Sequence, residues 1–303
     1  MKEQNYKNQV RLLLDVLPEV AKEDCLALHG GTAINLFVKD MPRLSIDIDL
    51  TYLPIENRQT TLHNIDAVLK RIKSRIEAVI SRVDIQHKSE TGKLFIRYNG
   101  AEIKLEVNLI GRGAISNPTK MLLCNRAQEE YNVSVIMPVV PLDQLYGGKI
   151  CAALDRQHPR DLFDIKYHLD NENFFNEVRK GFLLCLLSGG RPINEVLVPN
   201  FQDQRQVLEN QFAGMSKEVF TYNDFTRTRE KLVSVIREGL TEFDKTFLLS
   251  FKNGEPDWSI HNFERFPAVQ WKLQNLQKLK IMNSEKHKEL YKALKEKLTG
   301  KTT

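Results

Sequence analysis

Two aspartates, Asp47 and Asp49, are the residues whose types and spacing most directly suggest chemistry. They stand in the segment 45–52, where apolar and polar residues alternate as in a strand with one dry face. Residues two apart in a strand share a face, so the two carboxylates are neighbours. Two adjacent anions repel each other unless a cation lies between them, and carboxylate oxygens suit Mg²⁺. The alternative is an edge strand on which both acids point into solvent.

A glycine turn precedes this strand. Gly30, Gly31 and Thr32 follow a short apolar run at 25–29, which predicts a strand, and they open a helical segment. Glycine allows the backbone to approach a ligand closely, and free N–H groups at a helix start can hold phosphate. The turn therefore predicts a phosphate-binding element.

A third acid, Glu106, interrupts a later apolar strand. In the alternation of that strand it shares a face with Lys104 and Asn108. Either Glu106 is a third catalytic acid, or it forms a cross-strand salt bridge.

Together, these motifs resemble the DNA polymerase β-like nucleotidyltransferase superfamily. The resemblance implies an α+β fold, with a mixed sheet and flanking helices followed by a helical C-terminal domain. It implies that Asp47 and Asp49 bind Mg²⁺ (or Mn²⁺), and that Glu106 helps to activate the attacking hydroxyl. The glycine turn would hold the triphosphate of an NTP substrate, with Thr32 in place of the usual serine.

Two longer segments resemble one branch of that superfamily, the AbiEii/AbiGii toxin family, which includes the MenT toxins of type IV toxin–antitoxin systems. The first contains Gly30-Gly31-Thr32-Ala33 and then the sequence 43–50 around the two aspartates. The second begins at Pro141 and continues through Lys149 to the sequence 160–164. The two segments occur in the expected order and lie within residues 28–170.

The resemblance assigns functions to residues of the second segment. It implies that Lys149 contacts the nucleotide phosphates and that Asp164 is the essential late aspartate, while Arg156 and Asp161 join the nucleotide-binding set. From the residues alone, Lys149 either lies along the surface or directs a point charge at a triphosphate. Asp161 is in the first turn of a helix and can complement its dipole. Arg156 and Arg160 either pair with these acids or reach phosphate.

Ser45 lies two residues before Asp47 and therefore on the same strand face. In relatives, a hydroxyl residue at this place can be phosphorylated by a partner antitoxin, so the resemblance implies a regulatory phosphosite. A phosphate would add negative charge beside a metal site and block nucleotide binding. The alternative is an ordinary polar strand residue.

The remaining pattern predicts an α/β part at 1–140 and a helical part at 141–303. Asn99-Gly100 lies between two strand patterns and predicts a hairpin turn. The expected strands at and after this hairpin are 93–98, 102–110 and 133–136. The expected helices are 6–17 (ending at Pro18), 60–83, 141–155, 160–170, 174–188, 204–213, 226–251 and 262–298.

Composition excludes several classes of protein. The chain has 303 residues, is 42% hydrophobic and 27% charged, and contains no apolar run long enough to span a membrane. Its four cysteines show neither metal-ligand spacing nor a disulfide framework and are expected to be reduced, as in a cytoplasmic protein.

The net charge of +5 is concentrated at one end. Residues 270–303 contain nine Lys and three acidic residues, which leaves 35 basic and 36 acidic residues in the rest of the chain. Such a basic tail either contacts the backbone of a polyanion or forms a solvated helix face.

We therefore interpret the sequence as a metal-dependent nucleotidyltransferase toxin that transfers NMP from an NTP to an acceptor. The family resemblance implies that the acceptor is the 3′ end of tRNA, that a cognate antitoxin is the partner, and that the outcome is growth inhibition or phage defence. One alternative is a small-molecule, antibiotic-type nucleotidyltransferase. Another is a non-catalytic regulator that binds nucleotide or nucleic acid.

Overall fold

The computed structural model describes residues 2–299, and the chain divides into two compact units. Unit 1 comprises Met1–Leu145 and Leu208–Val219, and unit 2 comprises Tyr146–Val207 and Phe220–Thr303. The sequence pattern assigned residues 208–219 to the second part. They belong to unit 1 because their backbone pairs with the segment before the aspartates, where the Leu44 N–H donates to the Met215 carbonyl at 2.7 Å.

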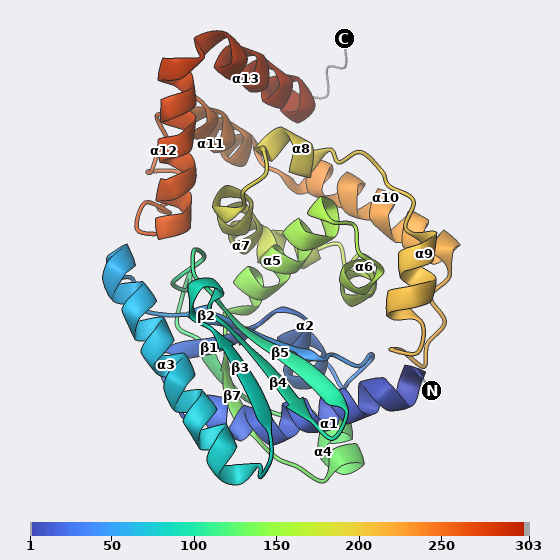
Figure 1. Cartoon of the computed structure of the whole chain (residues 1–303). Helices are drawn as coiled ribbons and strands as arrows, with labels where there is room; N and C mark the ends of the chain where they lie inside the picture. Colours follow the sequence, from blue (N-terminus) through green and yellow to red (C-terminus); the bar gives the residue numbers. More distant parts are fainter. Residues whose placement is uncertain (1, 300–303) are drawn as a thin grey trace. The chain divides into compact units, whose positions relative to one another are not determined.

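Unit 1 is built on a seven-stranded mixed sheet with the order β3-β4-β5-β2-β1-β7-β6 (Figure 1). The pairs β2–β5 and β1–β7 are parallel and the other pairs are antiparallel. The mixed sheet with flanking helices is thus confirmed. The strands are β1 (Leu26–His29), β2 (Asp47–Tyr52), β3 (Asp84–Lys88), β4 (Lys93–Tyr98), β5 (Ala101–Asn108), β6 (Thr119–Leu122) and β7 (Ile136–Val139).

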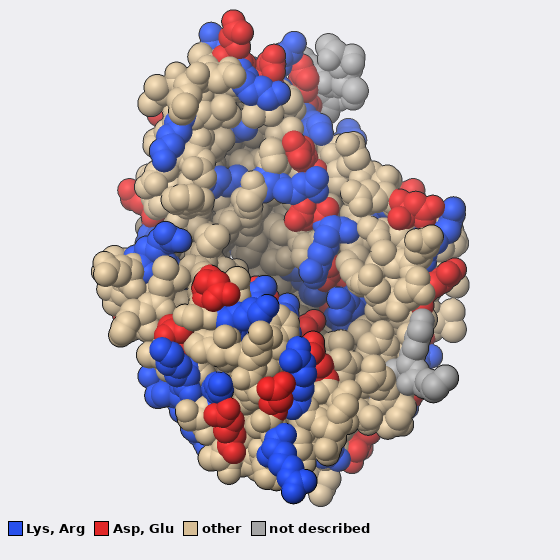
Figure 2. Space-filling view, viewed as in Figure 1, with Lys and Arg blue, Asp and Glu red and all other residues tan. Residues whose placement is uncertain are grey.

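One face of this sheet forms the core of unit 1. Ile48, Leu94 and Leu105 from three neighbouring strands are fully buried, and the helices α1 (Lys2–Val20) and α3 (Arg58–Val79) pack against these strands and each other (Figure 1). The residues next to each of these three in sequence point to the opposite face of the sheet, which is polar. Figure 2 shows basic and acidic side chains interspersed over β3, β4 and β5. The sheet therefore has one dry face and one face able to receive a charged ligand.

Several local predictions for unit 1 are confirmed, and others are wrong in their boundaries. The hairpin between β4 and β5 turns at Asn99 and Gly100, which both have positive φ (48° and 78°). The helix expected to end at Pro18 continues to Val20, with Pro18 inside its last turn. The strand expected at 133–136 begins three residues later and forms β7 at Ile136–Val139. Strands β3 and β6 were not predicted, because both are short edge strands, β3 is mostly polar and β6 has only four residues.

Unit 2 is helical, and its core contains fully buried phenylalanines such as Phe182, Phe225 and Phe247. Two predicted long helices are each split in two. The first is interrupted at Thr241, which forms a capping box with Asp244 and starts a new helix. The helices are α5 (Leu142–Asp155, which begins in unit 1), α6 (Pro159–Lys166), α7 (Phe174–Ser188), α8 (Ile193–Leu197), α9 (Arg205–Val207), α10 (Tyr222–Gly239), α11 (Glu242–Lys252), α12 (Pro267–Met282) and α13 (Ser284–Thr299).

Within residues 2–299, none of the helices combines the length and the apolar character that crossing a membrane requires.

Candidate active site

The glycine turn lies directly against the second aspartate. Strand β1 runs antiparallel to β2 with His29 opposite Asp49, so the chain leaves β1 beside that carboxylate. Gly30 has φ +74°, and a Cβ at this position would lie 2.6 Å from Asp49 Oδ2. Glycine is therefore required at position 30 both for its backbone conformation and for the close approach.

The next two residues of the turn contact the chain that leads into β2. A Cβ on Gly31 would lie 2.8 Å from Arg43 Nη2 and 3.1 Å from Ser45 Oγ. The Thr32 hydroxyl is fully buried, donates to the backbone carbonyl of Asp47 and lies 3.0 Å from Ser45 Oγ. Residues 30–33 then form the short helix α2 (Gly30–Ala33), which continues into the π-helical turn η1 (Ile34–Val38). The hydrogen bond of Thr32 and the close packing of Gly31 thus hold the glycine turn against the start of β2.

Strands β2 and β5 bring the predicted acids to one face. Their parallel register pairs Asp47 with Lys104 and Asp49 with Glu106, and both aspartates are half-buried. Glu106 Oε2 lies 2.9 Å from Lys104 Nζ, and Glu106 Oε1 lies 3.4 Å from Lys93 Nζ on β4. The salt bridge that the sequence left open for Glu106 is therefore present across β4 and β5.

Lys104 is a site residue that sequence reasoning did not single out. Burial alone lowers the pKa of Lys104, but its hydrogen bond with Glu106 and the charges of Asp49 and Asp47 raise that pKa above its ordinary value. The signal was visible in the sequence, since Lys104 shares the strand face of Glu106. The register of β2 and β5 was needed to show that Lys104 and Glu106 lie beside the two aspartates.

The two aspartates suit one divalent cation. Mg²⁺ commonly takes one or two protein carboxylates and completes its shell with water and phosphate oxygens, and the glycine turn leaves room for no side chain beside Asp49. Among residues 2–299, no group of three or more His, Cys, Asp or Glu side chains is arranged to hold a metal ion. The residues thus fit a site in which the substrate supplies part of the coordination.

Ser45, the predicted phosphosite, is only 6% exposed. Its hydroxyl lies beside Thr32 and the glycine turn, as described above. Phosphorylation at this position therefore requires the hydroxyl to leave its contact with Thr32.

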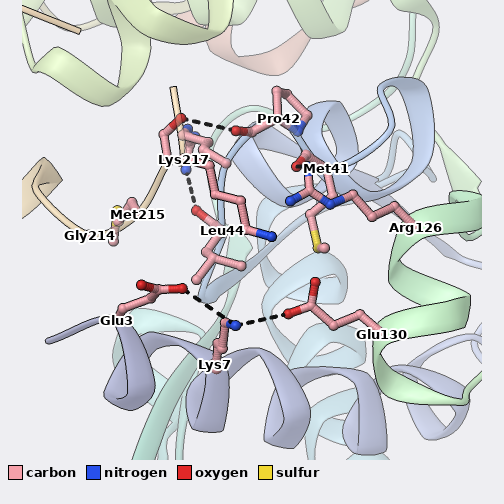
Figure 3. Close-up of a pocket in the computed structure, with 12 residues that line it drawn as sticks. Glu3, Lys7, Met41, Pro42, Leu44, Arg126, Glu130, Gly214, Met215 and Lys217 are labelled. Atoms are coloured by element: carbon pink, nitrogen blue, oxygen red, sulfur yellow. Dashed lines mark hydrogen bonds and ion pairs between the residues drawn. The ribbon is translucent and has the colours of Figure 1, made fainter. Parts of the chain in front are cut away.

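Unit 1 also contains a pocket of about 70 Å³ (Figure 3). It is lined by α1, by α4 (Asn125–Tyr131), by residues 41–44 and by residues 214–217. At its base, Lys7 lies 3.4 Å from both Glu3 and Glu130 (Figure 3). None of the predicted site residues lines this pocket.

In unit 2, the second set of predicted residues forms a buried charge cluster. Lys149 Nζ on α5 lies 2.9 Å from Asp161 Oδ1 and 3.0 Å from Asp164 Oδ2, both on α6. The side chain of Lys149 is only 5% exposed, and those of the two aspartates are 1% and 0% exposed. Neither aspartate therefore serves merely as a solvent-exposed partner of the helix dipole.

Arg156 completes this cluster. Its Nε lies 2.6 Å from Asp161 Oδ2 and its Nη2 lies 3.0 Å from Asp161 Oδ1, which makes a two-pronged ion pair. Burial raises the pKa of Asp161, but Lys149 and Arg156 outweigh burial and hold that pKa well below its ordinary value.

His158 caps α6 by accepting a hydrogen bond from the Arg160 N–H at 3.1 Å.

Tyr146, one turn before Lys149, is a second residue that the sequence did not identify as part of a site. Its ring packs against His168 and Phe174, with centroid distances of 4.5 and 5.6 Å. Its hydroxyl is buried and has no hydrogen-bond partner among residues 2–299, and burial followed by the charge of Asp164 raises its pKa. In the sequence it was indistinguishable from the apolar residues on the same helix face.

Comparison with known proteins assigns the chain to a family. The family model described as the nucleotidyl transferase AbiEii toxin of the type IV toxin–antitoxin system matches residues 11–275. No curated protein sequence matches the chain. Among solved structures, the chain is similar in fold to MenT4, a nucleotidyltransferase toxin from Mycobacterium tuberculosis H37Rv. That match has a TM-score of 0.58 at 15% identity and covers 88% of this chain and 92% of MenT4. Since the family match spans most of its length, the chain belongs to the AbiEii family of nucleotidyltransferase toxins.

Proposed function

We propose that the protein transfers a nucleoside monophosphate from an NTP to a hydroxyl group at the 3′ end of tRNA. The acceptor oxygen forms a bond to the α-phosphorus, the bond from that phosphorus to the bridging oxygen breaks, and pyrophosphate leaves. The proton of the hydroxyl is released to solvent. The observation that carries this proposal is the packing of the glycine turn against Asp49, with Asp47 on the same strand face.

In this proposal, Asp47 and Asp49 hold Mg²⁺ or Mn²⁺. Such an ion neutralises charge that develops on the phosphate oxygens during the transfer. The backbone of Gly30, Gly31 and Thr32 is the phosphate-binding element. Its role is supported by the close packing of Gly30 against Asp49, which places the start of α2 beside the proposed cation site.

Lys149 is proposed to contact the nucleotide phosphates. Asp161 and Arg156 act as positioning residues for it, because Asp161 is bonded to both cations at once. Asp164 holds Lys149 from the other side. A lysine fixed by two aspartates loses less side-chain freedom when it binds phosphate than a mobile surface lysine does.

Membership of the toxin family supports growth inhibition as the outcome and an antitoxin as the partner. We propose that the antitoxin acts on Ser45, whose phosphorylation would place negative charge beside Asp47 and oppose nucleotide binding. Phage defence is proposed as the biological setting.

The test is a transfer assay with four α-³²P-labelled NTPs, each offered with total tRNA in the presence of Mg²⁺. We expect label at the tRNA 3′ end, release of pyrophosphate, and loss of both in the Asp47→Asn and Asp49→Asn variants. Label on a drug-sized acceptor instead would support the antibiotic-type alternative. Nucleotide binding without release of pyrophosphate would support a non-catalytic regulator, and either result would contradict the proposal.

A further inference from the structure

The third acid of the site is already neutralised by lysines. Glu106 lies 2.9 Å from Lys104 and 3.4 Å from Lys93, so each of its oxygens faces an ammonium group. A two-metal phosphoryl transfer requires ligands for two cations, one at the attacking oxygen and one at the leaving oxygen. Among the described residues, the aspartate pair is not part of a larger metal-ligand group.

The strand register shows what stands near the pair in place of a third ligand. Lys104 lies directly opposite Asp47 in the parallel β2–β5 ladder, on the same sheet face. Its side chain is 31% exposed. An ammonium has three N–H donors, and one of them bonds to Glu106.

We propose that Lys104 supplies the second positive charge of the active site, so that the enzyme uses one divalent cation where related chemistry uses two. This inference rests on the proposed nucleotidyl transfer. Asp47 and Asp49 hold the single cation. Lys104 donates a hydrogen bond to the attacking oxygen and keeps its own proton. It stabilises the negative charge that this oxygen carries after its proton has gone to solvent and before its bond to the α-phosphorus forms.

Lys93 provides a matched control. It pairs with the same Glu106, but it lies on β4, which is separated from β2 by β5. Removing Lys93 leaves the charge of Lys104 beside the aspartates, whereas removing Lys104 leaves Asp47, Asp49 and Glu106 without that charge. The two substitutions delete the same chemical group and differ in which strand they change.

The experiment counts Mn²⁺ ions by electron paramagnetic resonance, as loss of the free-ion signal in titrations of the full chain. Each titration contains one non-hydrolysable NTP analogue, and the four nucleobases are tested in turn. We expect one bound Mn²⁺ per chain in the wild type and in Lys93→Met. In Lys104→Met we expect two, with the added site appearing at millimolar Mn²⁺. Lys104→Arg should return the count to one, and circular dichroism confirms that each variant folds.

The outcomes separate this inference from the function on which it rests. Two Mn²⁺ ions in the wild-type complex, or an unchanged count of one in folded Lys104→Met, would overturn the role of Lys104 and leave nucleotidyl transfer intact. If no Mn²⁺–nucleotide complex binds at all, the proposed function fails, and the inference fails with it.

Discussion

The two groups of charged residues differ in how their charges are compensated. On the sheet face of unit 1, three acids (Asp47, Asp49 and Glu106) stand with two lysines, and the aspartates are half-buried. In unit 2, two buried acids and two cations bind one another at 2.6–3.0 Å. The aspartates of the first group are half-buried, at a sheet face that a bound cation can reach. The second is balanced by its own side chains.

This difference separates carboxylates proposed to bind a ligand directly from carboxylates that hold another side chain, Lys149, in place. A buried ion pair loses most of its hydration and is stable only when every charge has a partner. Removing one member of the unit 2 cluster should therefore damage the fold. Removing a carboxylate from the half-exposed site should damage the reaction and leave the fold intact, since it relieves repulsion between neighbouring anions.

The largest expected effect is on catalysis. Asp49→Asn should lower the rate of nucleotidyl transfer by roughly 10³-fold or more, because it removes a carboxylate from the proposed cation site. The free energy of unfolding should change by less than about 0.5 kcal/mol. Single-turnover transfer and urea denaturation measure the two quantities. Retained transfer in the folded variant would refute the assignment of the site.

The reverse pattern is expected for Asp161→Asn. This change leaves Lys149 and Arg156 without their shared anion, and it should reduce the free energy of unfolding by about 3–5 kcal/mol. The matched control is Asp155→Asn, since Asp155 pairs with Arg191 at 2.8 Å where both side chains are nearly half exposed. That pair should contribute less than about 1 kcal/mol. Equal losses in urea denaturation would erase the distinction between buried and exposed charge.

The contribution of Asp161 should also depend on pH with a defined sign. Because Lys149 and Arg156 hold its folded-state pKa below the ordinary value, the carboxylate stabilises the fold at pH values above its unfolded pKa. The stability difference between wild type and Asp161→Asn should be constant from pH 7 to about pH 5. It should shrink as the pH falls below about 4, towards the folded pKa. A difference that grows in acid would contradict this sign.

A smaller effect is expected at the glycine turn. Gly30 and Gly100 have similar backbone angles, with φ of +74° and +78°, but only at Gly30 would an added Cβ meet a neighbour, Asp49, within 4 Å. Gly100→Ala should cost about 1 kcal/mol through backbone strain alone. Gly30→Ala should cost about 2 kcal/mol, because it also displaces the Asp49 carboxylate, and it should reduce transfer. If the two variants lose equal stability and retain activity, the turn does not position Asp49.

The elements that carry the site were predictable from the sequence because their signals are local. Period-two alternation located β2 and placed Asp47 and Asp49 on one face, and the Asn99-Gly100 turn located the hairpin. The partners of Glu106 depend on strand register, which a single strand does not encode. The break at Thr241 was missed because a capping box resembles ordinary polar residues when the flanking pattern stays helical. The inclusion of residues 208–219 in unit 1 depends on backbone pairing across more than 160 positions.

The basic tail shows the same limit, because three of its lysines donate to backbone carbonyls, a pairing that the sequence does not reveal. Lys272 Nζ donates to the carbonyls of Leu186, Gly189 and Arg191 at 3.0, 2.8 and 2.7 Å, at the C-terminal end of α7. Lys280 and Lys297 likewise donate to the carbonyls of Asn253 and Asn194. Part of the positive charge predicted for an acceptor or for solvent is thus used within unit 2, as in the Lys149 cluster.

Substituting lysines of the basic tail should have the smallest effect on the free energy of unfolding. Lys272→Met keeps most of the side chain and removes three hydrogen bonds, but it also removes a buried charge, since burial lowers the pKa of Lys272 to about 8. Losing the hydrogen bonds lowers the free energy of unfolding, and removing the buried charge raises it. We therefore expect the free energy of unfolding to fall by only about 1 kcal/mol at pH 7. Lys288→Met, on the exposed side of α13, should change stability by less than about 0.5 kcal/mol. If Lys288→Met instead weakens tRNA binding in low salt while Lys272→Met does not, the exposed lysines alone form the polyanion contact that the charge of the tail suggested.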